Sequence, residues 1–211
     1  MSNRFRIHKL TIGDFAVNNY LIVPENSSSA LLIDAGYPVQ PILDFLSARQ
    51  LHLKYVVNTH GHGDHIAGNQ DIIEATGASL LIHEQEVEYL RNPQLNLSAF
   101  LGFALKSPEP TRLLQEGDRV KLEELEFTVL HTPGHTPGHL TLLLENHAFV
   151  GDVIFREGIG RTDFPRASYH QLITTIREKI YQLPDDTILH PGHGPDTTVG
   201  YEKTHNPFVS M

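Results

Sequence analysis

The sequence predicts a mixed α/β fold, an αββα sandwich in which two packed sheets carry helices on their outer faces. Two observations predict it. Strand-like and helix-like segments alternate as strands, helix, strand, helix, and then again as strands, helix, strand. In addition, 211 residues with 40% hydrophobic and 19% charged content can bury the core of a single domain, expected over residues 1–211. Two halves of this kind favour packed sheets with outer helices.

The first half contains short β-like runs separated by turns, of which Gly13-Asp14 is the first. The expected strands are residues 5–12, 20–23, 30–33, 55–57 and 79–82. Helical spacing predicts helices over residues 42–50, after Pro41, and over residues 66–75, before Gly77.

The second half begins with an irregular segment, residues 84–115, which three prolines interrupt. We expect a helical excursion or lid there. The expected strands that follow are residues 120–122, 125–130, 140–144, 148–150 and 187–189. Residues 169–181 have apolar side chains on one helical face and predict an amphipathic helix.

Composition limits the function classes. The formal net charge of -9 argues against general binding of nucleic acid or anionic membranes. The chain has no cysteine, so thiol nucleophiles, disulfides and thiolate ligands are excluded. The first residues lack a signal-peptide pattern and no apolar run reaches about 20 residues, so we expect a cytoplasmic protein. The 14 histidines are the unusual feature.

The segment T-H-G-H-G-D-H at residues 59–65 directly follows a predicted strand. Alternate residues of an extended backbone project to the same side, so His60 and His62 can bind one ion. Asp64 and His65, at the start of the next helix, can face a second ion. A helix N-cap or a solvated loop histidine would explain one of these residues, but not all four. Imidazole and carboxylate suit zinc first, and also iron or manganese.

Three further strand ends carry histidine or aspartate. H-T-P-G-H-T-P-G-H at 131–139 presents three histidines, although Pro-Gly turns need no function. Asp152 ends an apolar run, and a buried carboxylate needs a metal, an arginine or backbone amides as its partner. H-P-G-H-G at 190–194 again follows a strand. Because loops on a rigid sheet often carry catalytic groups, these strand ends predict one metal site at an edge of the sandwich.

The order His-x-His-x-Asp-His, T-P-G-H, G-D and P-G-H-G resembles the metallo-β-lactamase superfamily from about Asp34 to the C-terminus. That family has the αββα fold. The resemblance implies that one metal is held by His60, His62 and His135, and a second by Asp64, His65 and His193. Asp152 would bridge the two ions. Asp152 and the absence of cysteine separate this chain from the antibiotic-degrading members that use a cysteine ligand.

Within the superfamily, G-D-V-I-F-R-E-G-I-G-R-T-D-F-P and the tail from His190 to Phe208 resemble the glyoxalase II-like hydroxyacylglutathione hydrolases of the short bacterial type. The resemblance implies that Asp34, Thr59 and His139 orient the ligands, although an ordinary turn role would equally explain Thr59. Long members hold glutathione with a basic C-terminal helical region, and the 18 residues after His193 are too few for it. By charge alone, the substrate-binding candidates are Arg161, Arg166, Lys106 and Lys203.

The expected reaction is hydrolysis of a thioester such as S-lactoylglutathione to a 2-hydroxy acid and a free thiol. Two ions roughly 3.5–4 Å apart would share a water and lower its pKa toward about 7, and Asp64 would hold its proton. The alternative is a persulfide dioxygenase with one iron on two histidines and Asp152, because those enzymes share G-R-T-D-F, here at 160–164. A lactonase, or a binding module without turnover, also stays open.

Overall fold

The N-terminal sheet has six strands in the order β1-β2-β3-β4-β5-β6, in a computed structural model that describes residues 4–102 and 104–209. They are β1 (Phe5–Ile12), β2 (Val17–Pro24), β3 (Ser29–Ile33), β4 (His52–Val57), β5 (Ser79–His83) and β6 (Arg112–Leu114). β1, β2 and β3 pair antiparallel, and β3 to β6 run parallel. β3 is buried along its whole length, as expected for a strand covered on both faces.

The C-terminal sheet also has six strands, in the order β14-β13-β10-β9-β8-β7. They are β7 (Arg119–Leu122), β8 (Leu125–His131), β9 (Leu140–Leu144), β10 (His147–Gly151), β13 (Ile188–Pro191) and β14 (Thr197–Thr198). Only β10 and β13 pair parallel among these described strands. A separate hairpin, β11 (Ile154–Phe155) and β12 (Gly158–Ile159), follows β10.

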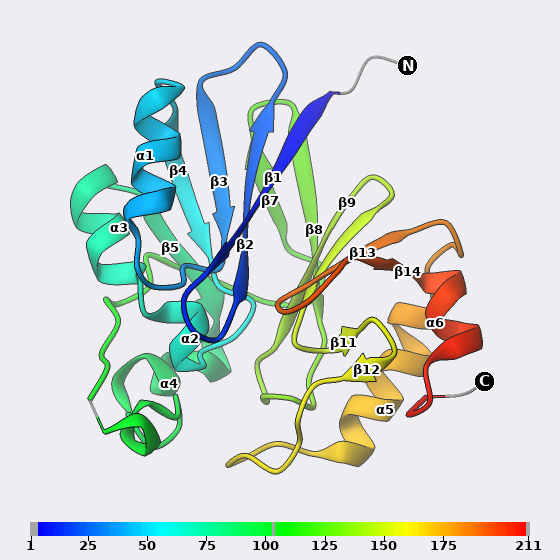
Figure 1. The fold of residues 1–211 in the computed structure, drawn as a ribbon. Helices are drawn as coiled ribbons and strands as arrows, with labels where there is room; N and C mark the ends of the chain where they lie inside the picture. Colours follow the sequence, from blue (N-terminus) through cyan, green and yellow to red (C-terminus); the bar gives the residue numbers. More distant parts are fainter. Residues whose placement is uncertain (1–3, 103, 210–211) are drawn as a thin grey trace.

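Helices cover the two outer faces of the sandwich, and α2 and α4 lie below the ends of the N-terminal strands (Figure 1). The α-helices are α1 (Gln40–Ala48), α2 (Gly63–Ile66), α3 (Asn69–Thr76), α4 (Val87–Arg91), α5 (Tyr169–Glu178) and α6 (Val199–His205). α1 and α3 cover the N-terminal sheet, and α5 and α6 cover the C-terminal sheet. The predicted αββα sandwich is therefore confirmed. In the part of the chain that the structure describes, none of the helices combines the length and apolar character needed to cross a membrane.

Three apolar layers hold the sandwich together. The central layer joins the two sheets, with Val57 of one facing Phe127 and Phe149 of the other. An outer layer packs Ile42 and other side chains of α1 and α3 on the N-terminal sheet, and a second packs Leu172 of α5 on the C-terminal sheet. Burial of each such side chain contributes about 1.5–3 kcal/mol, so the sheets form a rigid base for the loops at their ends.

The helix expected over residues 66–75 is observed as α3, which ends before Gly77 as predicted but begins three residues later, while Ile66 belongs to the short helix α2. The chain turns at Gly68, whose N–H donates to the carbonyl of Ala35 at 2.8 Å. A Cβ at this position would lie 2.6 Å from the carbonyl oxygen of Gly36. The close packing of this turn on a distant loop breaks the helix, and helical periodicity does not report such a contact.

Two other segments hold more regular structure than the sequence predicts. The segment 84–115 contains α4 and two 3-10 turns, as a helical excursion would, but it ends in β6 at the edge of the sheet. The tail after residue 194 forms β14 and α6. The side chain of Thr198 accepts a hydrogen bond from the N–H of Tyr201 and caps α6, a signal that was present in the sequence.

Candidate metal centre

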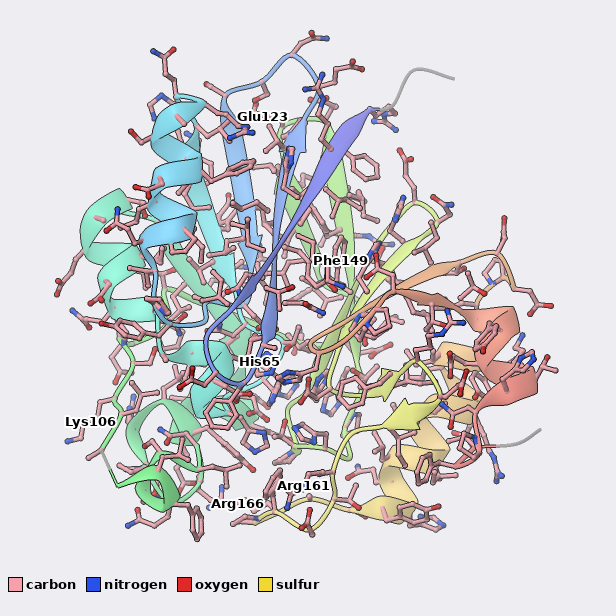
Figure 2. The ribbon with its side chains drawn as sticks, in the orientation of Figure 1. His65, Lys106, Glu123, Phe149, Arg161 and Arg166 are labelled. Carbon is pink, nitrogen blue, oxygen red and sulfur yellow. The ribbon has the colours of Figure 1, made fainter. Side chains whose placement is uncertain are left out.

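The predicted ligands come from four loops that meet at one edge of the sandwich. The loop after β4 carries four of them, the β8–β9 loop carries His135, the end of β10 carries Asp152, and the loop after β13 carries His193. Figure 2 shows His65 at this edge, between the two sheets and at the opposite end from Glu123. The structure thus brings together all seven residues that the sequence singled out.

The loop after β4 is shaped by its glycines. A Cβ on Gly61 would lie 2.4 Å from the Cβ of Tyr89, and a Cβ on Gly63 would lie 3.0 Å from the carbonyl oxygen of Asn96. The backbone therefore runs directly against the segment that contains α4. His60 and His62 project from this extended stretch, and α2 begins at Gly63.

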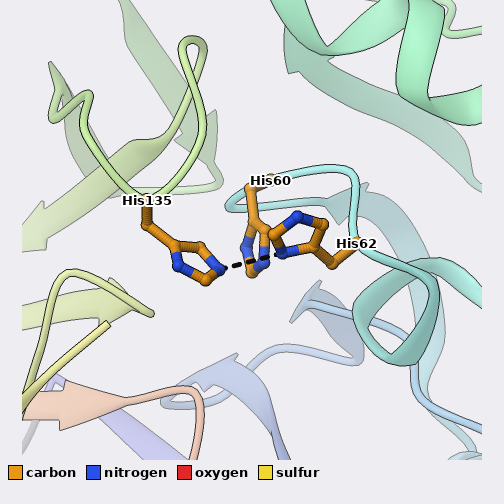
Figure 3. A group of neighbouring side chains, drawn as sticks. All are labelled: His60, His62 and His135. Atoms are coloured by element: carbon orange, nitrogen blue, oxygen red, sulfur yellow. Dashed lines mark hydrogen bonds between the residues drawn. The ribbon is translucent and has the colours of Figure 1, made fainter. Parts of the chain in front are cut away.

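The first group consists of His60, His62 and His135, whose ligand-type atoms lie within 4.8 Å of one another (Figure 3). His62 Nδ1 lies 2.9 Å from His135 Nε2. Among the described residues, His60 Nε2 and His62 Nε2 are buried and have no hydrogen-bond partner. Such atoms are costly without a partner, and a cation between the three rings would supply one.

The second group consists of Asp64, His65 and His193, again with ligand-type atoms within 4.8 Å. His193 Nε2 lies 3.4 Å from Asp64 Oδ2 and 3.3 Å from His65 Nε2. Burial opposes positive charge on His65, but Asp34, Asp64 and Asp152 together raise its pKa well above the ordinary value. The carboxylates around this position therefore attract positive charge.

Asp152 lies between the two groups. Its Oδ1 lies 3.4 Å from His65 Nε2, and its Oδ2 lies 3.6 Å from both His135 Nε2 and His193 Nε2. Burial alone would raise the pKa of Asp152, but the neighbouring histidines hold it far below its ordinary value. Asp152 Oδ1 is buried and has no hydrogen-bond partner among the described residues. An ionised carboxylate at this place, with one buried oxygen that lacks a hydrogen bond, fits a role between two cations.

Four histidines use Nδ1 to contact an oxygen atom. The distance is 3.1 Å from His60 to Thr59 Oγ1, 2.8 Å from His65 to Asp34 Oδ2, 2.7 Å from His135 to the Arg161 carbonyl, and 2.9 Å from His193 to the Phe15 carbonyl. Carbonyl and carboxylate oxygens only accept, and Thr59 Oγ1 already donates to Asp34. The Nδ1 atoms must therefore carry protons, which leaves Nε2 as the atom of each ring that faces the site and can bind a metal ion.

The three residues predicted to orient the ligands lie directly behind them. Asp34 accepts hydrogen bonds from the N–H and the hydroxyl of Thr59, both at 2.8 Å. His139 Nε2 accepts a hydrogen bond from the N–H of Asp152 at 3.1 Å. Burial and the neighbouring histidines lower the pKa of His60 and His62 well below the ordinary value, so both rings are neutral, the form that binds metal.

A cavity of about 650 Å³ opens over both groups. Its wall is largely apolar and includes Phe15, Leu97, Phe100, Leu101, Phe155 and Phe164. The side chain of Phe100 is 75% exposed, so it stands at the mouth rather than in the core. The sequence analysis missed these residues, because isolated phenylalanines in loops carry no signal of their own.

Of the four basic candidates, the structure places only Arg161 in the wall of this cavity. Its guanidinium pairs with Asp163 at 2.7 Å and stacks over Phe164, 4.2 Å from the ring centroid. Arg166 pairs with Glu88 at 2.7 Å, and Lys203 of α6 pairs with Asp185 at 2.6 Å. The last candidate, Lys106, lies at the periphery, away from His65 (Figure 2).

An αββα sandwich with a histidine and aspartate cluster at one sheet edge defines a class of metal-dependent enzymes. The family model for the metallo-beta-lactamase superfamily matches residues 12–193, and the chain belongs to this superfamily. It is a metallo-hydrolase with a His/Asp site for divalent metal. Hydroxyacylglutathione hydrolase GloC of Haemophilus influenzae is 36% identical over 204 residues, which cover 91% of this chain and 92% of that protein.

Solved structures share the fold over nearly the whole chain. The BLEG-1 B3 metallo-beta-lactamase is 31% identical, with a TM-score of 0.93, and the match covers 98% of this chain and 100% of that one. TTHA1623 in a di-iron-bound form is 33% identical, with a TM-score of 0.85 and coverage of 96% and 100%. ETHE1 from Myxococcus xanthus is 29% identical, with a TM-score of 0.80 and coverage of 96% and 83%.

Proposed function

We propose that this protein, as one domain over residues 1–211, hydrolyses a thioester such as S-lactoylglutathione to a 2-hydroxy acid and a free thiol. The observation that carries the proposal is the position of Asp152 between the two groups of ligands, from which its carboxylate could be shared by both metal ions. The likeness to hydroxyacylglutathione hydrolase GloC over 91% of the chain supports the thioester as substrate.

The proposed ligands are His60, His62 and His135 for one ion, and Asp64, His65 and His193 for the other, with Asp152 shared. Two bound divalent ions, zinc by expectation and iron or manganese as alternatives, would lower the pKa of water and polarise the thioester carbonyl. Asp64 lines the cavity, and although burial opposes it, His65 and His193 lower its pKa. The ionised Asp64 is therefore available to accept the proton of the attacking water.

The wall of the cavity would hold the rest of the substrate. Arg161 is the residue there that can bind a substrate carboxylate, and its ion pair with Asp163 is exposed, so it can be exchanged at little cost. The apolar side chains around it exclude water from the reacting carbonyl. A thiolate is a good leaving group, so the leaving sulfur needs little proton donation.

A persulfide dioxygenase is the second candidate, favoured by the string G-R-T-D-F at 160–164. Such an enzyme would bind one iron through two histidines and Asp152. It differs from the hydrolase in two measurable quantities, the amount of metal per chain and the consumption of O₂.

Both reactions can be assayed on one preparation with its metals quantified. Thiol release from S-lactoylglutathione without O₂ uptake, with about two metal ions per chain, is the result expected for the hydrolase. Consumption of O₂ with glutathione persulfide, and about one iron per chain, would overturn it. Because the BLEG-1 structure bears the name of a lactamase, a β-lactam belongs in the same substrate panel.

A further inference from the structure

Glu86 is a fully buried carboxylate that joins the two loops carrying His60, His62 and His135, called the three-histidine group below. Its Oε2 accepts a hydrogen bond from the N–H of Gly61 at 2.8 Å, and its Oε1 accepts one from the N–H of Gly138 at 2.7 Å. Gly61 separates His60 from His62, and Gly138 lies three residues after His135. One side chain thus connects a loop of the N-terminal sheet to a loop of the C-terminal sheet.

The same two glycines allow this close approach. A Cβ on Gly61 would lie 3.1 Å from Glu86 Oε2 as well as 2.4 Å from Tyr89, and a Cβ on Gly138 would lie 2.8 Å from Glu86 Cγ. No larger residue fits at either position while the hydrogen bonds are kept. The two loops are therefore built around Glu86, which the proposed reaction does not use.

The second group is held by other contacts. Asp34 holds His65, and the Phe15 carbonyl accepts from His193 Nδ1. Neither of the two backbone N–H groups that donate to Glu86 lies in the loop after β13. Asp64 and His65 lie on the same loop as Gly61, but His65 and His193 have these further contacts, so we expect a change at Glu86 to act chiefly on the three-histidine group.

We propose that Glu86 is a positioning residue that selectively holds His60, His62 and His135 in place for a metal ion. The inference rests on the proposed ligand sets and is independent of the substrate. A carboxylate can accept both hydrogen bonds, whereas the amide of glutamine has one acceptor and one donor. In a Glu86→Gln variant, one buried N–H therefore loses its partner, and the loop that carries it is released.

The test uses two backgrounds that each keep one group. His193→Ala leaves the three-histidine group complete, and His135→Ala leaves Asp64, His65 and His193 complete. The affinity for Zn²⁺ is measured by chelator competition at alkaline pH, where the carboxyl of Glu86 is ionised. In the His193→Ala background, we expect Glu86→Gln to weaken Zn²⁺ binding about 10- to 100-fold, the usual effect of removing a residue that supports a ligand. In the His135→Ala background, we expect no change.

The matched control is Glu84→Gln, an exposed glutamate in the same 3-10 turn, which should change neither affinity. Equal losses in both backgrounds would show general disruption and overturn the inference, and so would equal retention. If Glu86→Gln does not fold, Glu86→Asp keeps the charge and should show a smaller loss in the His193→Ala background only. If the His193→Ala variant itself does not bind Zn²⁺, both the proposed ligand set and this inference are overturned. If the parent protein binds Zn²⁺ as expected but does not hydrolyse the thioester, only the proposed reaction is overturned.

Discussion

His65 Nδ1 lies 2.8 Å from Asp34 Oδ2, and both side chains are buried. The carboxylate accepts the proton of Nδ1, so Nε2, which lies 3.4 Å from Asp152 Oδ1, is the atom of this ring that a metal ion can bind. Asp34 also accepts two hydrogen bonds from Thr59, which precedes the first ligand of the loop. A single carboxylate therefore sets the tautomer of one predicted ligand and the backbone next to another.

Replacing Asp34 with asparagine should weaken metal binding at the second group about 10- to 100-fold. Asp34 has a φ of 58°, a conformation that asparagine also tolerates, so the backbone should persist. The new amide would place a donor against His65 Nδ1, which favours the tautomer with its proton on Nε2. That tautomer cannot bind a metal ion through Nε2. Metal content per chain and chelator competition would measure the loss.

The control for this change is Asp71→Asn, an exposed aspartate in the first turn of α3. It should leave metal content unchanged. If Asp34→Asn binds two ions as tightly as the parent protein, the hydrogen bond to His65 does not orient a ligand.

Replacing Asp152 with alanine should remove metal and hydrolysis together. Asp152 is the residue that lies within reach of both groups, so its loss weakens both, and we expect at least an about 100-fold loss of affinity. His205→Ala is the matched control, because His205 is exposed and stacks on Tyr201 of the same helix. Elemental analysis and thiol release would be measured on both variants, and full retention of both by Asp152→Ala would contradict the bridging role.

The predicted and observed folds agree where local pattern decides the structure. β1 was predicted with its observed bounds, and the ends of most other strands shift by a few residues. The predictions failed where a distant contact decides. The carbonyl of Gly36 limits the space at Gly68, where α2 and α3 are separated, and β6 is a three-residue edge strand that pairs with β5.

The same distinction holds for the site. His60 to His65 could be predicted from spacing, because the four side chains follow one another in a single loop. The ligands on other loops needed the order of motifs in the family, since spacing does not reveal which loops meet. Glu86 was not predicted at all. It has exposed glutamates two residues to either side, and nothing in the sequence indicates that it alone is buried.

Replacing Phe100 with alanine should raise KM for the thioester about three- to tenfold, with kcat little changed. Phe100 lines the mouth of the cavity and lies outside the ligand groups, so it contributes apolar contact to substrate and transition state alike. Partial burial of one aromatic ring by a substrate is worth about 1 kcal/mol. Steady-state kinetics would measure the change. Phe208→Ala, an equally drastic change at an exposed phenylalanine outside the cavity, should change neither constant, and an unaltered KM for Phe100→Ala would exclude this wall from substrate binding.

The stability of the metal-free protein should depend on pH through Glu86. Burial raises the pKa of this carboxyl from 4.5 to about 7, although the N–H groups of Gly61 and Gly138 and the charge of Arg166 oppose the rise. The adjacent Tyr89 faces the same carboxyl, and its own pKa is raised chiefly by burial. Between pH 4.5 and about 7, the carboxyl of Glu86 therefore holds a proton in the folded protein and has released it in the unfolded chain. The stabilisation is therefore complete below pH 4.5 and is lost as the pH rises through about 7.

Glu86→Gln resembles the protonated side chain at every pH, so it isolates this effect. The free energy of unfolding of the parent protein, relative to that of Glu86→Gln, should fall with rising pH by up to about 1.4 kcal/mol per pH unit within this range. Denaturant unfolding of both metal-free proteins at several pH values gives the difference, in which the titrations of the histidines common to both cancel. A difference that does not change with pH would mean that Glu86 stays ionised in the folded protein, held by its two backbone hydrogen bonds against the cost of burial.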